Sequence, residues 1–185
     1  MQFHRRVVSL SCRAMSNLKS VVPETVRSTA SSGSQVYESK RAVDEYLLFH
    51  YGHSTDHFSF EGGPNEALNF PVRCASICND HLDFILTKKC TRALDVGCAV
   101  GGSSFELAKI FDEVVGIDFS QHFVDAANQM KLDGKMSFET LVRGHIYRTC
   151  ETNLDQSIDR ANVTFQQGDA CNLEESIGRL LWDVV

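Results

Sequence analysis

From residue 94 the chain runs Leu94-Asp95-Val96-Gly97-Cys98-Ala99-Val100-Gly101-Gly102, and a second apolar run, Val114-Val115-Gly116-Ile117-Asp118, follows it. The first stretch is typical of a buried strand that ends in a glycine loop, and the second of a strand that ends in an acid. The order strand, glycine loop, helix, strand and acid is how an open α/β sheet builds a ligand site at its strand ends. We therefore expect an α/β fold, with an open parallel sheet and helices on both faces.

The glycine spacing distinguishes between two classes of adenosine-containing cofactor. Dinucleotide sites use Gly-x-Gly-x-x-Gly, whose second glycine lets the backbone approach a pyrophosphate. Ala99 stands where that glycine is needed, so a nicotinamide oxidoreductase is a distant alternative. The spacing of Asp95, Gly97 and Gly101 instead favours S-adenosylmethionine, which carries no phosphate.

Three acids at successive strand ends are expected to hold this cofactor. Asp95 is placed to meet its ammonium group, and Asp118 to accept hydrogen bonds from both ribose hydroxyls. A third strand, over residues 163–167, runs into Asp169, which would accept from the adenine amino group. The alternative for each acid is a loop residue without a ligand. The predicted cofactor-binding residues are Asp95, Gly97, Cys98, Ala99, Gly101, Asp118, Phe119, Asp169 and Ala170.

Hydrophobic spacing predicts helices around these strands. Ser103 begins a Ser-x-x-Glu capping box, and Ser120 is expected to cap the next helix. Upstream, helices are expected over residues 36–51 and 75–87. The inward side chains of the second are predicted to be Ile77, Leu82, Phe84, Ile85 and Leu86. Residues 131–162 exceed a usual connection, and we expect a partly structured insertion near the substrate side.

The composition of the 185 residues, 43% hydrophobic and 23% charged, is typical of one ordinary globular domain. The net charge of −6 gives no electrostatic case for nucleic acid, and no run approaches the roughly 20 apolar residues of a membrane span. Residues 1–23 hold four basic side chains and no acid. Residues 1–35 are therefore expected to be a disordered tail, with a mitochondrial transit segment as the alternative.

The cysteines and histidines carry weaker signals. Seven cysteines without a Cys-x-x-Cys motif favour reduced thiols, which predicts a cytoplasmic location, with the mitochondrion as the alternative. His50, His53 and His57, with Asp56, have the spacing of metal ligands on a helix, but Gly52 makes a continuous helix there unexpected. No metal site is predicted.

Taken together, the motifs resemble the C-terminal methyltransferase domain of ovothiol-biosynthesis enzymes, the 4-mercaptohistidine N1-methyltransferase family. The resemblance covers residues 36–185 and rests on residues 46–52, 69–71, 94–120 and 168–173. It implies a class I (Rossmann-like) methyltransferase fold, S-adenosylmethionine as cofactor, and a histidine-derived thiol as the small-molecule acceptor. It also implies further strands after position 185. We therefore expect a sheet that is C-terminally truncated within a fourth strand beginning at residue 182.

The acceptor side of the site is less specific in sequence. His50 and Tyr51 are candidates for lining the acceptor pocket, with packing of the N-terminal helix as the alternative reading, and no catalytic residue is assigned. The resulting hypothesis is an N-methyltransferase acting on the imidazole of a thiol-histidine. The alternatives are a methyltransferase for another small molecule and a truncated, non-catalytic fragment. The sequence predicts no oligomeric state.

Overall fold

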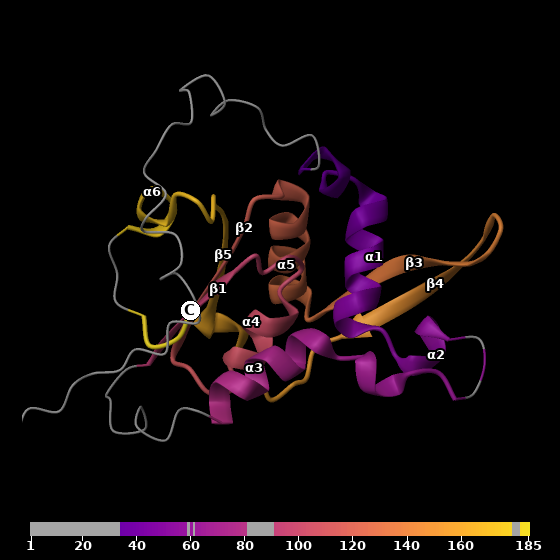
Figure 1. Cartoon of the computed structure of the whole chain (residues 1–185), viewed down its shortest axis with the longest axis horizontal. Helices are drawn as coiled ribbons and strands as arrows, with labels where there is room; N and C mark the ends of the chain where they lie inside the picture. Colours follow the sequence, from indigo (N-terminus) through magenta and orange to yellow (C-terminus); the bar gives the residue numbers. More distant parts are fainter. Residues whose placement is uncertain (1–33, 59, 61, 81–90, 179–181) are drawn as a thin grey trace, which may run out of the picture. The chain divides into compact units, whose positions relative to one another are not determined.

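The centre of the protein is a parallel sheet with strand order β1-β2-β5 (Figure 1). The computed structural model describes residues 34–58, 60, 62–80, 91–178 and 182–185. The strands are β1 (Arg92–Val96), β2 (Glu113–Asp118) and β5 (Val163–Gln167). Leu94 pairs with Val115, and Gly116 pairs with Phe165. The parallel sheet and its helices confirm the predicted α/β class.

The connections between these strands explain where the helices lie. α4 (Gly102–Leu107) joins β1 to β2, and α5 (Gln121–Asp133) begins the longer connection from β2 to β5. Both connections step across the sheet in the same direction, so right-handed crossovers place both helices on one face. α6 (Leu173–Ile177) follows β5, and Val184, near the end of the chain, pairs with the other side of β1.

The last described residues pair with the outer edge of β1. Val184 forms a parallel bridge with Ala93, and the Leu94 amide donates to the Val184 carbonyl at 2.9 Å. The predicted fourth strand is thus present as a single bridge. Because the strand order reverses beside β1, the carboxyl end of β1 is the topological switch point where α/β sheets bind ligands.

The upstream segment contains a helix in each of the two predicted regions. Its elements are η2 (Ser34–Tyr37), α1 (Lys40–Tyr51), α2 (Ser54–His57), η3 (Asn65–Ala67) and α3 (Phe70–Asp80). α1 begins four residues after the predicted start, with Ser39 as its N-cap. α3 begins five residues before the predicted start, because Pro71 suits the first turn of a helix. The inward placement of Ile77 was wrong, since this side chain is 57% exposed. Residues 82–86 lie outside the described residues.

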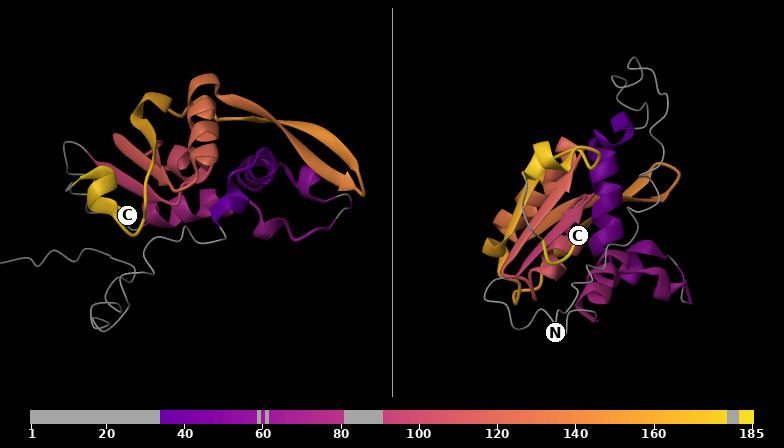
Figure 2. Two further views of the ribbon diagram at one scale, coloured as in Figure 1. Left: turned by 90° about the horizontal axis from the view of Figure 1, so that it is seen from above. Right: turned by 60° about the vertical axis from the view of Figure 1, so that its left-hand side comes forward.

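The long connection after α5 forms an antiparallel hairpin of β3 (Lys135–Arg143) and β4 (Ile146–Asn153). Figure 2 shows it extending away from the parallel sheet. Phe138 anchors its base, because this side chain is 1% exposed, within the main core. Leu141 and Ile146 near the tip are more than half exposed.

The two crossover helices bury apolar side chains that recur at helical spacing. The buried side chains are Phe105, Leu107, Ala108 and Phe111 around α4, and Phe123, Ala126, Ala127 and Met130 of α5. Ser120 caps α5 as predicted, since its hydroxyl accepts from the Phe123 amide at 3.3 Å. None of the helices among the described residues has the length and apolar character needed to cross a bilayer.

The capping box predicted at Ser103 does not form. Gly101, with φ of 89°, occupies the N-cap position, so Ser103 lies inside α4. The Ser103 hydroxyl instead donates to the Pro71 carbonyl at 3.1 Å, which ties α4 to α3. A left-handed glycine already turns the chain into the helix, and the serine is left free to make a tertiary contact.

Candidate functional site

The Asp118 carboxylate joins two loops at the strand ends. Its Oδ2 accepts from the Ala99 amide and its Oδ1 from the Ser120 amide, each at 2.9 Å. A carboxylate has about four lone-pair positions, and Asp118 is only half-buried. It therefore orders the loop and keeps lone pairs for further hydrogen bonds, while its role toward ribose hydroxyls stays a prediction.

The glycine loop has positive φ at every second residue, and only one of these residues has a side chain. Gly97, Ala99 and Gly101 have φ values of 81°, 46° and 89°. A Cβ on Gly97 would meet no atom within 4 Å, whereas one on Gly101 would lie 2.7 Å from the Phe165 ring. Gly97 thus borders open space at the strand ends and Gly101 is packed against β5. Ala99 adopts a left-handed conformation that costs a residue with a side chain about 1 kcal/mol or more.

Asp95 lies beside this loop at the end of β1. The Ser104 hydroxyl of α4 donates to its Oδ2 at 2.6 Å. Burial raises the pKa of Asp95, and the negative charge of Asp118 raises it further, while the Ser104 hydrogen bond opposes the rise. An ammonium group next to this carboxyl would favour its charged form. The arrangement therefore suits the cationic end of the predicted cofactor.

The end of β5 is fastened to the end of β2. The Gly168 amide donates to the Asp118 carbonyl, and the Gln167 side chain to the Phe119 carbonyl, each at 2.9 Å. Asp169 and Ala170 follow and are exposed, as is the Phe119 ring at 53%. The structure therefore brings these predicted residues to one edge of the sheet, where a flat ring could contact Phe119.

Cys98 is buried and belongs to the hydrophobic core beneath the glycine loop. Burial is the main cause that raises the pKa of its thiol far above the ordinary value. This rise favours the protonated thiol at neutral pH, and the cofactor-binding role of Cys98 stays a prediction.

His50 and Tyr51 reach this loop from the end of α1. The Gly102 amide donates to His50 Nδ1 at 3.1 Å, and the Tyr51 hydroxyl donates to the Val100 carbonyl at 2.8 Å. Both contacts join residues about 50 positions apart, and sequence reasoning missed them because no local pattern marks such a pair. The acceptor-pocket role of the two residues stays a prediction.

Asp56, which lies among the histidines after α1, makes local and long-range hydrogen bonds. The His53 amide donates to Asp56 at 3.0 Å, at the start of α2. Arg148 of β4 also donates to Asp56, at 3.0 Å. Among the described residues, no group of three or more His, Cys, Asp and Glu is arranged to hold a metal ion.

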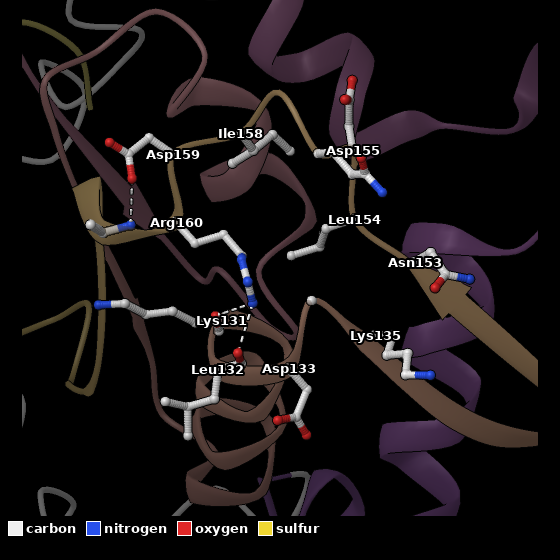
Figure 3. A pocket seen from close by; sticks show the side chains of 13 residues that line it. Lys131, Leu132, Asp133, Lys135, Asn153, Leu154, Asp155, Ile158, Asp159 and Arg160 are labelled. Atoms are coloured by element: carbon white, nitrogen blue, oxygen red, sulfur yellow. Dashed lines mark hydrogen bonds between the residues drawn. The ribbon is translucent and has the colours of Figure 1, made fainter.

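A pocket of about 680 Å³ lies at the other end of the sheet (Figure 3). It is lined by residues 131–135 and by residues between 153 and 161, where β5 begins. Arg160 donates to the carbonyls of Lys131 and Leu132 at 2.6 and 2.8 Å. The guanidinium thus completes the last turn of α5. This pocket does not include the strand-end acids, so we place the candidate site at the glycine loop.

Residues 94–176 match the family model described as a methyltransferase domain. No curated protein matches the chain. Among solved structures, the chain is similar to precorrin 8W decarboxylase from Methanobacterium thermoautotrophicum, with 22% identity and a TM-score of 0.31, over 53% of this chain and 40% of that one. It is also similar to magnesium protoporphyrin IX methyltransferase from Synechocystis with bound S-adenosylhomocysteine, with 20% identity and a TM-score of 0.31, over 71% and 52%. This chain spans about half of each neighbour or less, and these scores are too low to transfer an activity.

Proposed function

We propose that this chain, whose residues 94–176 match a methyltransferase domain, transfers a methyl group from S-adenosylmethionine to an imidazole nitrogen of a thiol-bearing histidine. The observation that supports the cofactor assignment is that Asp95, the glycine loop and Asp118 lie together at the switch point of a parallel sheet. The acceptor is supported by the resemblance of the sequence motifs to the ovothiol-type family.

The residues present fit the cofactor. The open space over Gly97 leaves room for a ligand, Asp95 suits an ammonium group, and Asp118 keeps lone pairs for ribose hydroxyls. When bound, S-adenosylmethionine supplies a methyl group that a neutral ring nitrogen can take by in-line displacement. The protein's part is to align the reactants and exclude water. A strong base is not required, because a neutral imidazole already carries a lone pair.

The first test is calorimetric titration of the full chain with S-adenosylmethionine. Saturable binding at one site per chain supports the cofactor assignment, and Asp118→Ala should weaken it. Absence of binding would contradict the assignment for this chain and favour the alternative of a non-catalytic fragment.

The second test concerns the acceptor. Transfer of a labelled methyl group should be faster to a 4-thiol-substituted histidine than to histidine itself. Mass spectrometry of the product should place the new methyl group on the ring nitrogen and not on sulfur. Equal rates with the two compounds would favour a methyltransferase for another small molecule.

A further inference from the structure

The glycine loop is held from two sides by different parts of the chain. β2 holds its first half, since the Gly97 and Cys98 amides donate to the Ile117 carbonyl at 2.8 and 3.0 Å, and Ala99 is bound by Asp118. The second half is held by α1, which contacts Val100 and Gly102. The left-handed conformation of Ala99, between two glycines that also have positive φ, persists only when its surroundings determine it.

The α1 contacts are built into the core. His50 is 8% exposed, and Val100 and Gly102 are buried. A Cβ on Gly102 would lie 2.5 Å from His50 Nδ1, so the imidazole rests directly on the loop backbone. Since Nδ1 accepts a hydrogen bond, the neutral ring carries its proton on Nε2. The Tyr51 hydroxyl has the complementary role and donates.

We propose that His50 and Tyr51 are positioning residues that set the affinity for the cofactor by holding Val100–Gly102 in their binding shape. This inference rests on the proposed function, because it concerns the same cofactor. It gives α1 a function besides packing: an acceptor at position 50 and a donor at position 51 complete the loop that β2 alone holds only in part.

The experiment compares three test variants and one control variant in the full chain. His50→Leu removes the acceptor, whereas His50→Asn offers a carbonyl oxygen near the position of Nδ1. Tyr51→Phe removes only the hydroxyl. Val43→Ala is the matched control, because it removes buried methyl groups from the same helix, about two turns away.

Titration with S-adenosylmethionine should show a loss of affinity of roughly tenfold for His50→Leu and Tyr51→Phe, the size expected for a buried polar group left without its partner. His50→Asn should recover most of that loss. Val43→Ala should lower the melting temperature and leave the affinity unchanged. Equal affinity losses in Val43→Ala and His50→Leu, or none in Tyr51→Phe, would overturn the proposal.

A second measurement separates this inference from the proposed cofactor. Hydrogen exchange of residues 98–104 in the ligand-free chain should be faster in His50→Leu and Tyr51→Phe than in the wild type, and unchanged in Val43→Ala. If the wild type binds no S-adenosylmethionine but the exchange pattern holds, the cofactor assignment fails and the positioning role stands. Unchanged exchange in both variants would refute the positioning role whatever the wild type binds.

Discussion

At the scale of single residues, one carboxylate, that of Asp118, both orders the glycine loop and is the predicted acceptor for ribose hydroxyls. It accepts hydrogen bonds from the amides of Ala99 and Ser120, and it is expected to accept hydrogen bonds from ribose hydroxyls as well. Its replacement therefore loosens the loop as well as removing an acceptor. The sequence indicates the second task, and the structure adds the first.

Asp118→Ala should reduce the affinity for S-adenosylmethionine by roughly 1.5–3 kcal/mol, the range for hydrogen bonds to a charged group. Calorimetric titration measures this loss. Asp133→Ala is the control, since it removes an exposed acid at the other end of α5. Equal affinities of Asp118→Ala and the wild type would contradict the ribose assignment.

His50 should make stability depend on pH. Burial lowers its pKa from 6.5 to about 4 in the folded protein, so the unfolded chain binds the proton more readily. The stabilisation is complete above pH 6.5 and is lost as pH falls toward 4, by about 3 kcal/mol in all. Unfolding by urea at several pH values should show a shallower dependence for His50→Asn than for the wild type between pH 6.5 and 4. Parallel curves would show that His50 is not the group responsible.

At the scale of elements, the glycine loop and the hairpin each have one part that is packed in the core and one part that borders solvent. In the loop, Gly97 borders open space and Gly101 is packed against Phe165. In the hairpin, the buried Phe138 fixes the base, while the tip carries exposed apolar side chains. The loss of stability caused by a substitution in each element therefore depends on whether the replaced residue is packed against the core or borders solvent.

The two loop glycines should respond differently to alanine. Gly97→Ala should weaken cofactor binding with a modest loss of stability of about 1–2 kcal/mol, from its positive φ alone. Gly101→Ala should lose more stability, because its Cβ would also collide with Phe165. Gly144→Ala in the hairpin turn is the control for φ strain, since its Cβ too meets nothing within 4 Å. Thermal unfolding and titration of all three separate strain, packing and binding. A Gly97→Ala protein that binds like Gly144→Ala would place the cofactor elsewhere.

The hairpin should be sensitive at its base and tolerant at its tip. Phe138→Ala should cost about 3–5 kcal/mol, since a fully buried aromatic ring is removed from the core. Ile146→Thr at the tip, where the side chain is 65% exposed, should change stability by no more than about 0.5 kcal/mol. Urea unfolding of both variants measures the contrast. Similar losses in the two would mean that the tip is also packed.

At the scale of the whole molecule, the parallel sheet and α1 both contact the glycine loop. The loop receives contacts from β2 on one side and α1 on the other. The loop therefore keeps its shape only in the folded chain, and a ligand that needs this shape binds only the native state. A ligand that binds only the native state must stabilise it.

S-adenosylmethionine at 100 times its dissociation constant should therefore add about 2.7 kcal/mol of stability, and raise the melting temperature by roughly 5–10 °C. Differential scanning calorimetry with and without the cofactor measures the shift. NAD at the same concentration is the control and should leave the melting temperature unchanged, since Ala99 replaces the glycine that a pyrophosphate site needs. A larger shift with NAD would reverse the cofactor assignment.

The sequence by itself determined the α/β class, the three strands of the parallel sheet, the glycine loop and the acids at the strand ends. These follow from apolar runs and glycine spacing, which are local, and strand ends of a parallel sheet lie at a common edge. The start of α3, the exposed Ile77 and the failed capping box at Ser103 were mispredicted, because tertiary contacts decide among several acceptable local choices.

Only the tertiary structure decided how the loop is held. The α1 contacts with Val100 and Gly102 join segments about 50 residues apart, and the hairpin of residues 135–153 shows its anchored side only once Phe138 packs in the core. Periodicity describes which face of an element is apolar, but it does not identify the element that this face meets. That choice depends on the packing of the whole chain. Here the packing placed α1, which precedes the sheet in the sequence, against the glycine loop, so that α1 helps to hold the loop.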